Sequence, residues 1–110
     1  MNITLLHYSV PPIVGGVESV IAHHARLMSA DGHSVHLIAA RGEPLPTGGC
    51  ANEKIPLAAI PLADSRHARV AEMKEQLDRG EVTGDFESLR DALAEQLLAA
   101  LPGVEILIAH

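Results

Sequence analysis

The sequence predicts an α/β fold, a Rossmann-like doubly wound parallel sheet, and three observations lead to this class. Apolar segments at residues 3–8 and 34–40 flank an amphipathic helical segment at 17–30. This strand–helix–strand unit has the length of a parallel crossover, which is right-handed in nearly all proteins. The last segment, 104–109, is apolar at every position except Glu105, as expected for a strand covered on both faces.

The first strand and the first helix are the clearest elements. Leu5 and Leu6 break strict alternation in the strand, so we expect both of its faces to be covered. Gly32 stands where a left-handed C-cap would end the helix. We expect His24 to be a hydrogen-bonded histidine in or near the core. The helix has one apolar face with helical spacing, which contains Val17, Val20, Ile21, His24 and Met28.

The second half of the chain is less regular. Residues 41–52 form a loop rich in Gly and Pro, and residues 54–62 form a weaker strand that its prolines confine to an edge. A charged, solvated helix is predicted at 65–79. A second helix is predicted at 86–101, with Asp85 as its N-cap. Its apolar face contains Phe86, Leu89, Leu93, Leu97, Ala100 and Leu101.

Composition excludes several classes of function. The 110 residues suffice for one small domain, and their net charge of −6 does not suit a general nucleic-acid binder. Tyr8 and Phe86 are the only aromatic residues besides histidine, too few for a platform that stacks bases or sugar rings. Cys50 is the single cysteine, which excludes an internal disulfide and a cysteine-based zinc site. The first residues lack a basic signal segment, so we expect a cytoplasmic protein.

The turn at Gly15 and Gly16 is the strongest candidate for ligand binding. It follows a strand and opens a helix, so glycine backbone and unpaired helical N–H groups together would suit a phosphate or diphosphate. A plain glycine-containing turn explains the same spacing, and the spacing alone leaves both interpretations open. The G-x-G-x-x-G fingerprint of dinucleotide binding is absent.

Other polar residues give weaker signals. Ser9 and Arg41 follow the first and second strands, and both are candidates for binding an acceptor, although a solvated loop cation explains Arg41 equally well. Glu18 is best interpreted as capping its own helix, where negative charge is favoured. No pair among the seven histidines has the i, i+4 spacing of a helical metal site, so we expect no bound metal. Cys50 has no activating partner nearby in the sequence.

Two motifs carry a resemblance to a known family. The turn Gly15-Gly16-Val17-Glu18 and the segment Gly32-His33-Ser34-Val35, at this separation, resemble the start of the family 4 (group 1) glycosyltransferases. These are retaining enzymes of the GT-B fold, in which two Rossmann-like domains face a cleft. The resemblance covers about the first 40 residues well and the final strand moderately. It implies transfer of a sugar from a nucleotide-diphosphate sugar, a substrate, to an acceptor hydroxyl, with no metal or other cofactor.

The resemblance also implies roles for particular residues. Gly15 and Gly16 would contact the donor diphosphate, and His110, at the end of the final strand, would lie beside the reacting sugar as a catalytic candidate. Most donor-binding residues of the family belong to a second, C-terminal domain. We therefore expect residues 1–110 to be a partial N-terminal, acceptor-side domain that is inactive alone. In the doubly wound order the first and last strands are neighbours, which would bring these sites to one crevice.

Two alternatives remain open at this point. One is a nucleotide-sugar epimerase of GT-B fold, and the other is a non-catalytic, flavodoxin-like module that binds a ligand or partner. The identities of the donor and acceptor, and any peripheral membrane contact of the full enzyme, are not encoded in these motifs. We also expect the chain to self-associate, because the apolar strand at 104–109 would form an exposed edge.

Overall fold

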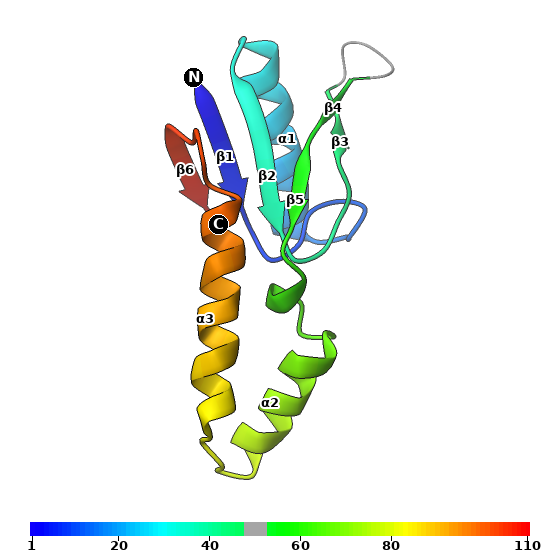
Figure 1. Cartoon of the computed structure of the whole chain (residues 1–110). Helices are drawn as coiled ribbons and strands as arrows, with labels where there is room; N and C mark the ends of the chain where they lie inside the picture. Colours follow the sequence, from blue (N-terminus) through cyan, green and yellow to red (C-terminus); the bar gives the residue numbers. More distant parts are fainter. Residues whose placement is uncertain (48–52) are drawn as a thin grey trace.

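The computed structural model describes residues 1–47 and 53–110, and its centre is a four-stranded parallel sheet (Figure 1). The strands follow the order β5-β2-β1-β6, and each neighbouring pair is parallel. The expected α/β class and parallel sheet are therefore confirmed, with the third and the last predicted strands at the two edges. The bounds of the strands are Asn2–Leu6 for β1, Ser34–Ala39 for β2, Leu57–Ala59 for β5 and Ile106–Ala109 for β6.

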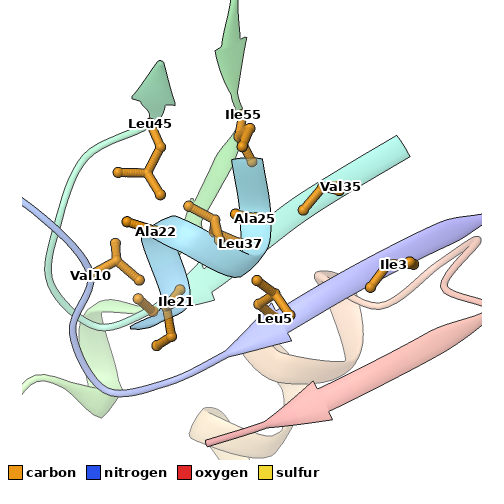
Figure 2. Packing of buried hydrophobic residues seen from close by; sticks show 11 residues of the cluster. Ile3, Leu5, Val10, Ile21, Ala22, Ala25, Val35, Leu37, Leu45 and Ile55 are labelled. Carbon is orange, nitrogen blue, oxygen red and sulfur yellow. The ribbon is translucent and has the colours of Figure 1, made fainter. Parts of the chain in front are cut away.

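One helix covers one face of this sheet. Helix α1 (Gly16–Ala30) lies behind β2 in Figure 1. Its Ile21 packs among Leu5 and Leu37, as Figure 2 shows, and all three side chains are almost inaccessible to solvent. Removing such branched side chains from water supplies about 1.5–3 kcal/mol each, which makes this layer the main source of stability.

The rotation of α1 differs from the expected one. Ile21, Ala22 and Ala25 are buried, whereas His24 is exposed and Val20 keeps 45% of its surface accessible. The two alanines have small side chains, so the helix can approach the sheet along the face that they share with Ile21. The expectation that His24 lies in or near the core is therefore wrong.

The opposite face of β1 is covered as well, but by a loop. Thr4 is buried on that face, and the segment 100–104 contributes Ala100 and Gly103 to a cavity that Thr4 also lines. His36 and Leu107, on the neighbouring strands, remain exposed. The expected coverage of both faces thus holds for β1, is incomplete on β2, and is not found for β6, where Ile106 and Leu107 are exposed.

A short antiparallel pair joins the predicted loop at 41–52 to the start of the strand predicted at 54–62. Strand β3 (Leu45–Pro46) pairs with β4 (Lys54–Ile55), and the side chains of Leu45 and Ile55 join the core beside α1. Two residues are too few for a recognisable alternation, so β3 had no signal in the sequence, whereas β4 lies within the predicted strand. Cys50 lies outside the described residues.

The remaining helices extend beyond the sheet. The 3₁₀ turn η1 (Pro61–Ala63) leads into α2 (Ala68–Asp78), which is followed by α3 (Gly84–Ala99). Helix α3 packs against η1 and α2 past the carboxyl ends of the strands, and none of its residues is fully buried (Figure 1). The molecule is consequently elongated, with principal extents of 50 × 29 × 21 Å.

The start of α3 also differs from the prediction. Thr83 is the N-cap, because its hydroxyl accepts a hydrogen bond from the Asp85 N–H at 3.3 Å. Asp85 therefore lies within the first turn, where its negative charge interacts favourably with the helix dipole. The prediction that Asp85 is the N-cap is wrong. In the described parts of the chain, no helix combines the length and the apolar character required to cross a membrane.

Candidate functional site

The candidate site is the side of the sheet at which the carboxyl ends of β2, β1 and β6 meet. Leu6 of β1 pairs with Ile38 of β2 and with Ala109 of β6, so the three strands reach this edge together. Main-chain hydrogen bonds continue past them, from His110 N–H to Leu6 O at 2.9 Å and from His7 N–H to Ile38 O at 3.1 Å. In open α/β sheets, ligands bind outside the carboxyl ends of the strands.

Ser9 and Arg41, both predicted to bind an acceptor, lie side by side at this edge. Their main chains form an isolated parallel bridge, and the Val10 N–H donates to Arg41 O at 2.9 Å. Ser9 is only 5% exposed, and its hydroxyl donates to the Glu18 carboxylate. Ser9 thus joins the end of β1 to the first turn of α1, because its buried hydroxyl is hydrogen-bonded to Glu18.

The Glu18 carboxylate occupies the start of α1. It accepts a hydrogen bond from the Ser9 hydroxyl, and this bond is the main reason that the pKa of the carboxyl is lowered. The carboxylate also lies against Gly15, where an added Cβ would collide with it. A side chain at position 15 would therefore displace the flexible Glu18 carboxylate, which lies in the first turn of α1, where negative charge is favoured.

Gly16 has more space than Gly15. It is the first residue of α1, and no atom would contact a Cβ added there. The open side of the turn is therefore at Gly16, while the Gly15 side is filled by Glu18.

Arg41 is the half-buried cation of the site. Its Nε atom is buried and has no hydrogen-bond partner in the described part of the chain. Its positive charge is the smallest of the causes that lower the pKa of Asp64. A guanidinium at the carboxyl ends of parallel strands can bind a carboxylate, phosphate or hydroxyl group through its terminal N–H groups.

A second polar cluster at this edge had not been recognised in the sequence. The Arg66 guanidinium binds the Asp64 carboxylate, with Nη2 2.8 Å from Oδ2, and holds the pKa of that carboxyl far below its usual range. The Tyr8 hydroxyl lies 2.9 Å from Ser65 Oγ and accepts from the Ser65 N–H at 3.1 Å. The Tyr8–Ser65 contacts join residues 57 positions apart, and no local pattern in the sequence indicates them.

Three histidines surround the end of β6. His7 Nδ1 lies 3.1 Å from the main-chain oxygen of His110, and the rings of His24 and His110 are 6.3 Å apart between centroids. His24 therefore belongs to the surroundings of His110 instead of the core. The imidazole of His110 is exposed.

Two cavities open at the same edge. One, of about 240 Å³, lies between the strand ends, η1 and α3, and its lining includes His7, Tyr8 and His110. The other, of about 390 Å³, is bordered by Asp64, Arg66 and His67. Both include Ala40, the residue that follows β2.

Metal ligation is not indicated in the parts of the chain that the structure covers. Across residues 1–47 and 53–110, no three side chains of the metal-binding types gather closely enough to hold an ion. His33 instead lies 3.4 Å from the amino group of Met1 and 3.5 Å from Asp31.

Comparison with known proteins adds no relative to this description: no family model, no curated protein and no solved structure matches the chain.

Proposed function

We propose that residues 1–110 form the acceptor-side domain of a retaining glycosyltransferase of GT-B fold, similar to family 4, which transfers a sugar from a nucleotide-diphosphate sugar to an acceptor hydroxyl. One observation carries the proposal. Strands β1 and β6 are direct neighbours in the sheet. The segment that leads to the Gly15-Gly16 turn leaves the carboxyl end of β1, and His110 directly follows the carboxyl end of β6. Both therefore begin at the same end of the sheet. The resemblance implies this pairing of sites.

The proposal assigns the following roles to the residues at this end of the sheet. The open side of the turn at Gly16 receives the donor diphosphate, and His110 stands beside the transferring sugar. Arg41 is the acceptor-side cation, while Ser9 and Glu18 hold the turn in shape. Main-chain N–H groups and a fixed cation stabilise developing charge without reorganisation, which is the largest single source of rate enhancement in many enzymes.

The donor is bound mainly by a second domain in this proposal, as the family resemblance implies. The nucleotide sugar is a substrate, and the proposal requires no resident metal or cofactor. The enzyme is placed in the cytoplasm, where a lone cysteine is compatible with a reducing environment.

The decisive experiment uses the product of the complete reading frame that encodes this chain. It is incubated with a panel of nucleotide sugars and hydroxyl acceptors, and release of nucleoside diphosphate and formation of the glycoside are measured. We expect transfer with retention of configuration, and a loss of about 10²-fold in kcat for His110→Ala, the size seen when one charge-stabilising group is removed. His36→Ala, an exposed histidine on the other side of the sheet, is the matched control.

Three results would contradict the proposal. They are epimerisation of the donor without transfer, an absence of any turnover, and equal rates for His110→Ala and the unchanged protein. Calorimetry on residues 1–110 alone tests whether the donor is bound mainly by a second domain. Tight nucleotide-sugar binding by this chain would place the donor site here instead.

A further inference from the structure

The cavity between α3, η1 and the strand ends has apolar walls. Its volume is about 240 Å³, and its apolar lining includes Leu6, Ile38, Ile60, Ala63, Leu93 and Leu97. Since a water molecule occupies about 30 Å³ in the liquid, this volume corresponds to about eight waters, or to a two-ring aromatic or branched hydrocarbon group. Water gains few hydrogen bonds in such a space, whereas an apolar group gains from leaving bulk water.

Charged ligands do not suit this cavity. Among the described residues that line it there is no Asp, Glu, Lys or Arg. An ionised group placed there would lose its hydration without gaining a charged partner, which is costly. The neighbouring cavity, by contrast, is bordered by the ion pair of Asp64 and Arg66.

One polar residue of the lining, His7, is able to accept a hydrogen bond. His7 Nδ1 lies 3.1 Å from the main-chain oxygen of His110, and an oxygen of this kind only accepts. The proton of a neutral His7 ring is therefore on Nδ1, and the lone pair is on Nε2. The Tyr8 hydroxyl, also in the lining, is already engaged with Ser65. A ligand hydroxyl in the cavity thus finds its acceptor in His7 Nε2.

We propose that this cavity binds a neutral, mainly apolar portion of a ligand that carries a hydroxyl group, and that His7 Nε2 accepts the hydrogen bond of that hydroxyl. The inference rests on the proposed function only in identifying this ligand as the sugar acceptor. In that case the acceptor is an apolar alcohol or phenol, and not a free sugar.

The test is a titration of the 110-residue chain with 2-naphthol, a neutral two-ring phenol, followed by NMR. Tyr8 is the only tyrosine and Phe86 the only phenylalanine, so each gives a single, assignable ring system. Tyr8 lines the cavity and Phe86 does not. We expect saturable shifts of the Tyr8 ring signals, no shift of the Phe86 signals, and no saturable effect of glucose at the same concentrations.

Two variants locate the binding site. Ala63→Leu fills the cavity and is expected to weaken 2-naphthol binding about tenfold or more, which corresponds to about 1.4 kcal/mol or more. Ala99→Leu, at an exposed position of α3 outside the lining, is the matched control and should bind as the unchanged chain does. If Ala63→Leu does not fold, as judged by circular dichroism, Leu93→Asn tests the same wall by making it polar.

The hydroxyl contact is tested separately with 2-methoxynaphthalene, which has no O–H to donate. We expect the unchanged chain to prefer 2-naphthol several-fold, and His7→Leu to abolish this preference. Absence of a Tyr8 shift, equal binding of glucose, undiminished binding by a folded cavity variant, or a preference that persists in His7→Leu would each overturn the inference. The titration needs no sugar donor, so its result is independent of the transfer assay.

Discussion

The buried hydroxyl of Ser9 donates a hydrogen bond to the carboxylate of Glu18, which ties the end of β1 to the first turn of α1. The same carboxylate lies against Gly15, where a side chain would collide with it. The glycine and the glutamate of this motif therefore form one structural unit, since Gly15 leaves the space that Glu18 fills. The unit leaves Gly16 as the open position of the turn.

Replacement of Ser9 by Ala is expected to raise the pKa of the Glu18 carboxyl, because the Ser9 hydrogen bond is the largest cause of its lowering. A lowered folded-state pKa stabilises the fold above the unfolded-state pKa, and this contribution is lost as the pH falls. The Ser9→Ala variant should therefore lose less stability on acidification. Carboxyl ¹³C NMR against pH measures the shift.

Ser19→Ala is the matched control for this variant, because the Ser19 hydroxyl donates to Gly15 O at 3.1 Å and does not contact Glu18. An unchanged Glu18 pKa in Ser9→Ala, or an equal shift in both variants, would be incompatible with the arrangement described.

Because of the ion pair between Asp64 and Arg66, we expect the thermal stability of the fold to fall at acidic pH. Arg66 lowers the pKa of the Asp64 carboxyl, so the pair stabilises the fold above the unfolded-state value of about 3.9 and ceases to do so as the pH falls below it. Asp64→Asn should show a shallower loss of thermal stability between about pH 5 and pH 2. Asp91→Asn removes an exposed ion pair with Arg90 and should lose as much thermal stability on acidification as the unchanged protein. The same dependence of thermal stability on pH in the unchanged protein and both variants would refute the prediction.

Gly42 is a position where only glycine fits. Its φ is +135°, and an added Cβ would lie 2.7 Å from the main-chain oxygen of Val10, a fully buried residue at the candidate site. We expect Gly42→Ala to lower the free energy of unfolding by roughly 1–3 kcal/mol. Urea denaturation measures this loss.

Gly84→Ala is the comparison for Gly42→Ala. Gly84 begins α3, and nothing would contact a Cβ there, so we expect no loss of stability and a gain of up to about 1 kcal/mol from reduced backbone freedom. A Gly42→Ala protein as stable as Gly84→Ala would show that the chain after β2 takes another path.

We expect copies of the chain to associate through the exposed edge of strand β6. It is an edge strand with the apolar sequence Ile-Leu-Ile-Ala, and Leu107 keeps 46% of its surface accessible. An edge of this kind can pair with another chain, and a lysine on it opposes such pairing. We expect light scattering to show a mass that rises with concentration, and Leu107→Lys to suppress the rise. Leu98→Lys, on the exposed side of α3, should have little effect, and a monomer at every concentration would contradict the prediction.

Much of the fold was predictable from local patterns. The apolar segments around residues 3–8 and 34–40, and the helix between them, agree with β1, β2 and α1 to within one or two residues. Pro56 breaks the segment 54–62 into β4 and β5, and β5 lies at the edge, as its prolines predicted. Each of these features depends on residues that are neighbours in the sequence.

The errors have a different origin. The burial of Ile21, Ala22 and Ala25 in place of His24 depends on how closely α1 approaches the sheet, and several rotations suit an apolar stripe of this width. Likewise, Thr83 rather than Asp85 caps α3, because both side chains can cap a helix and the backbone path decides between them.

The candidate site shows the same division. The sequence by itself determined the α/β class, the strand and helix segments, and the Gly15-Gly16 turn at the start of a helix, because hydrophobic period, glycine and proline act locally. Only the tertiary structure decided that the Ser9 hydroxyl is buried on Glu18, that Tyr8 contacts Ser65, and that His7 and α3 enclose an apolar cavity. These relationships depend on how the segments pack in three dimensions, and packing is a property of the whole chain.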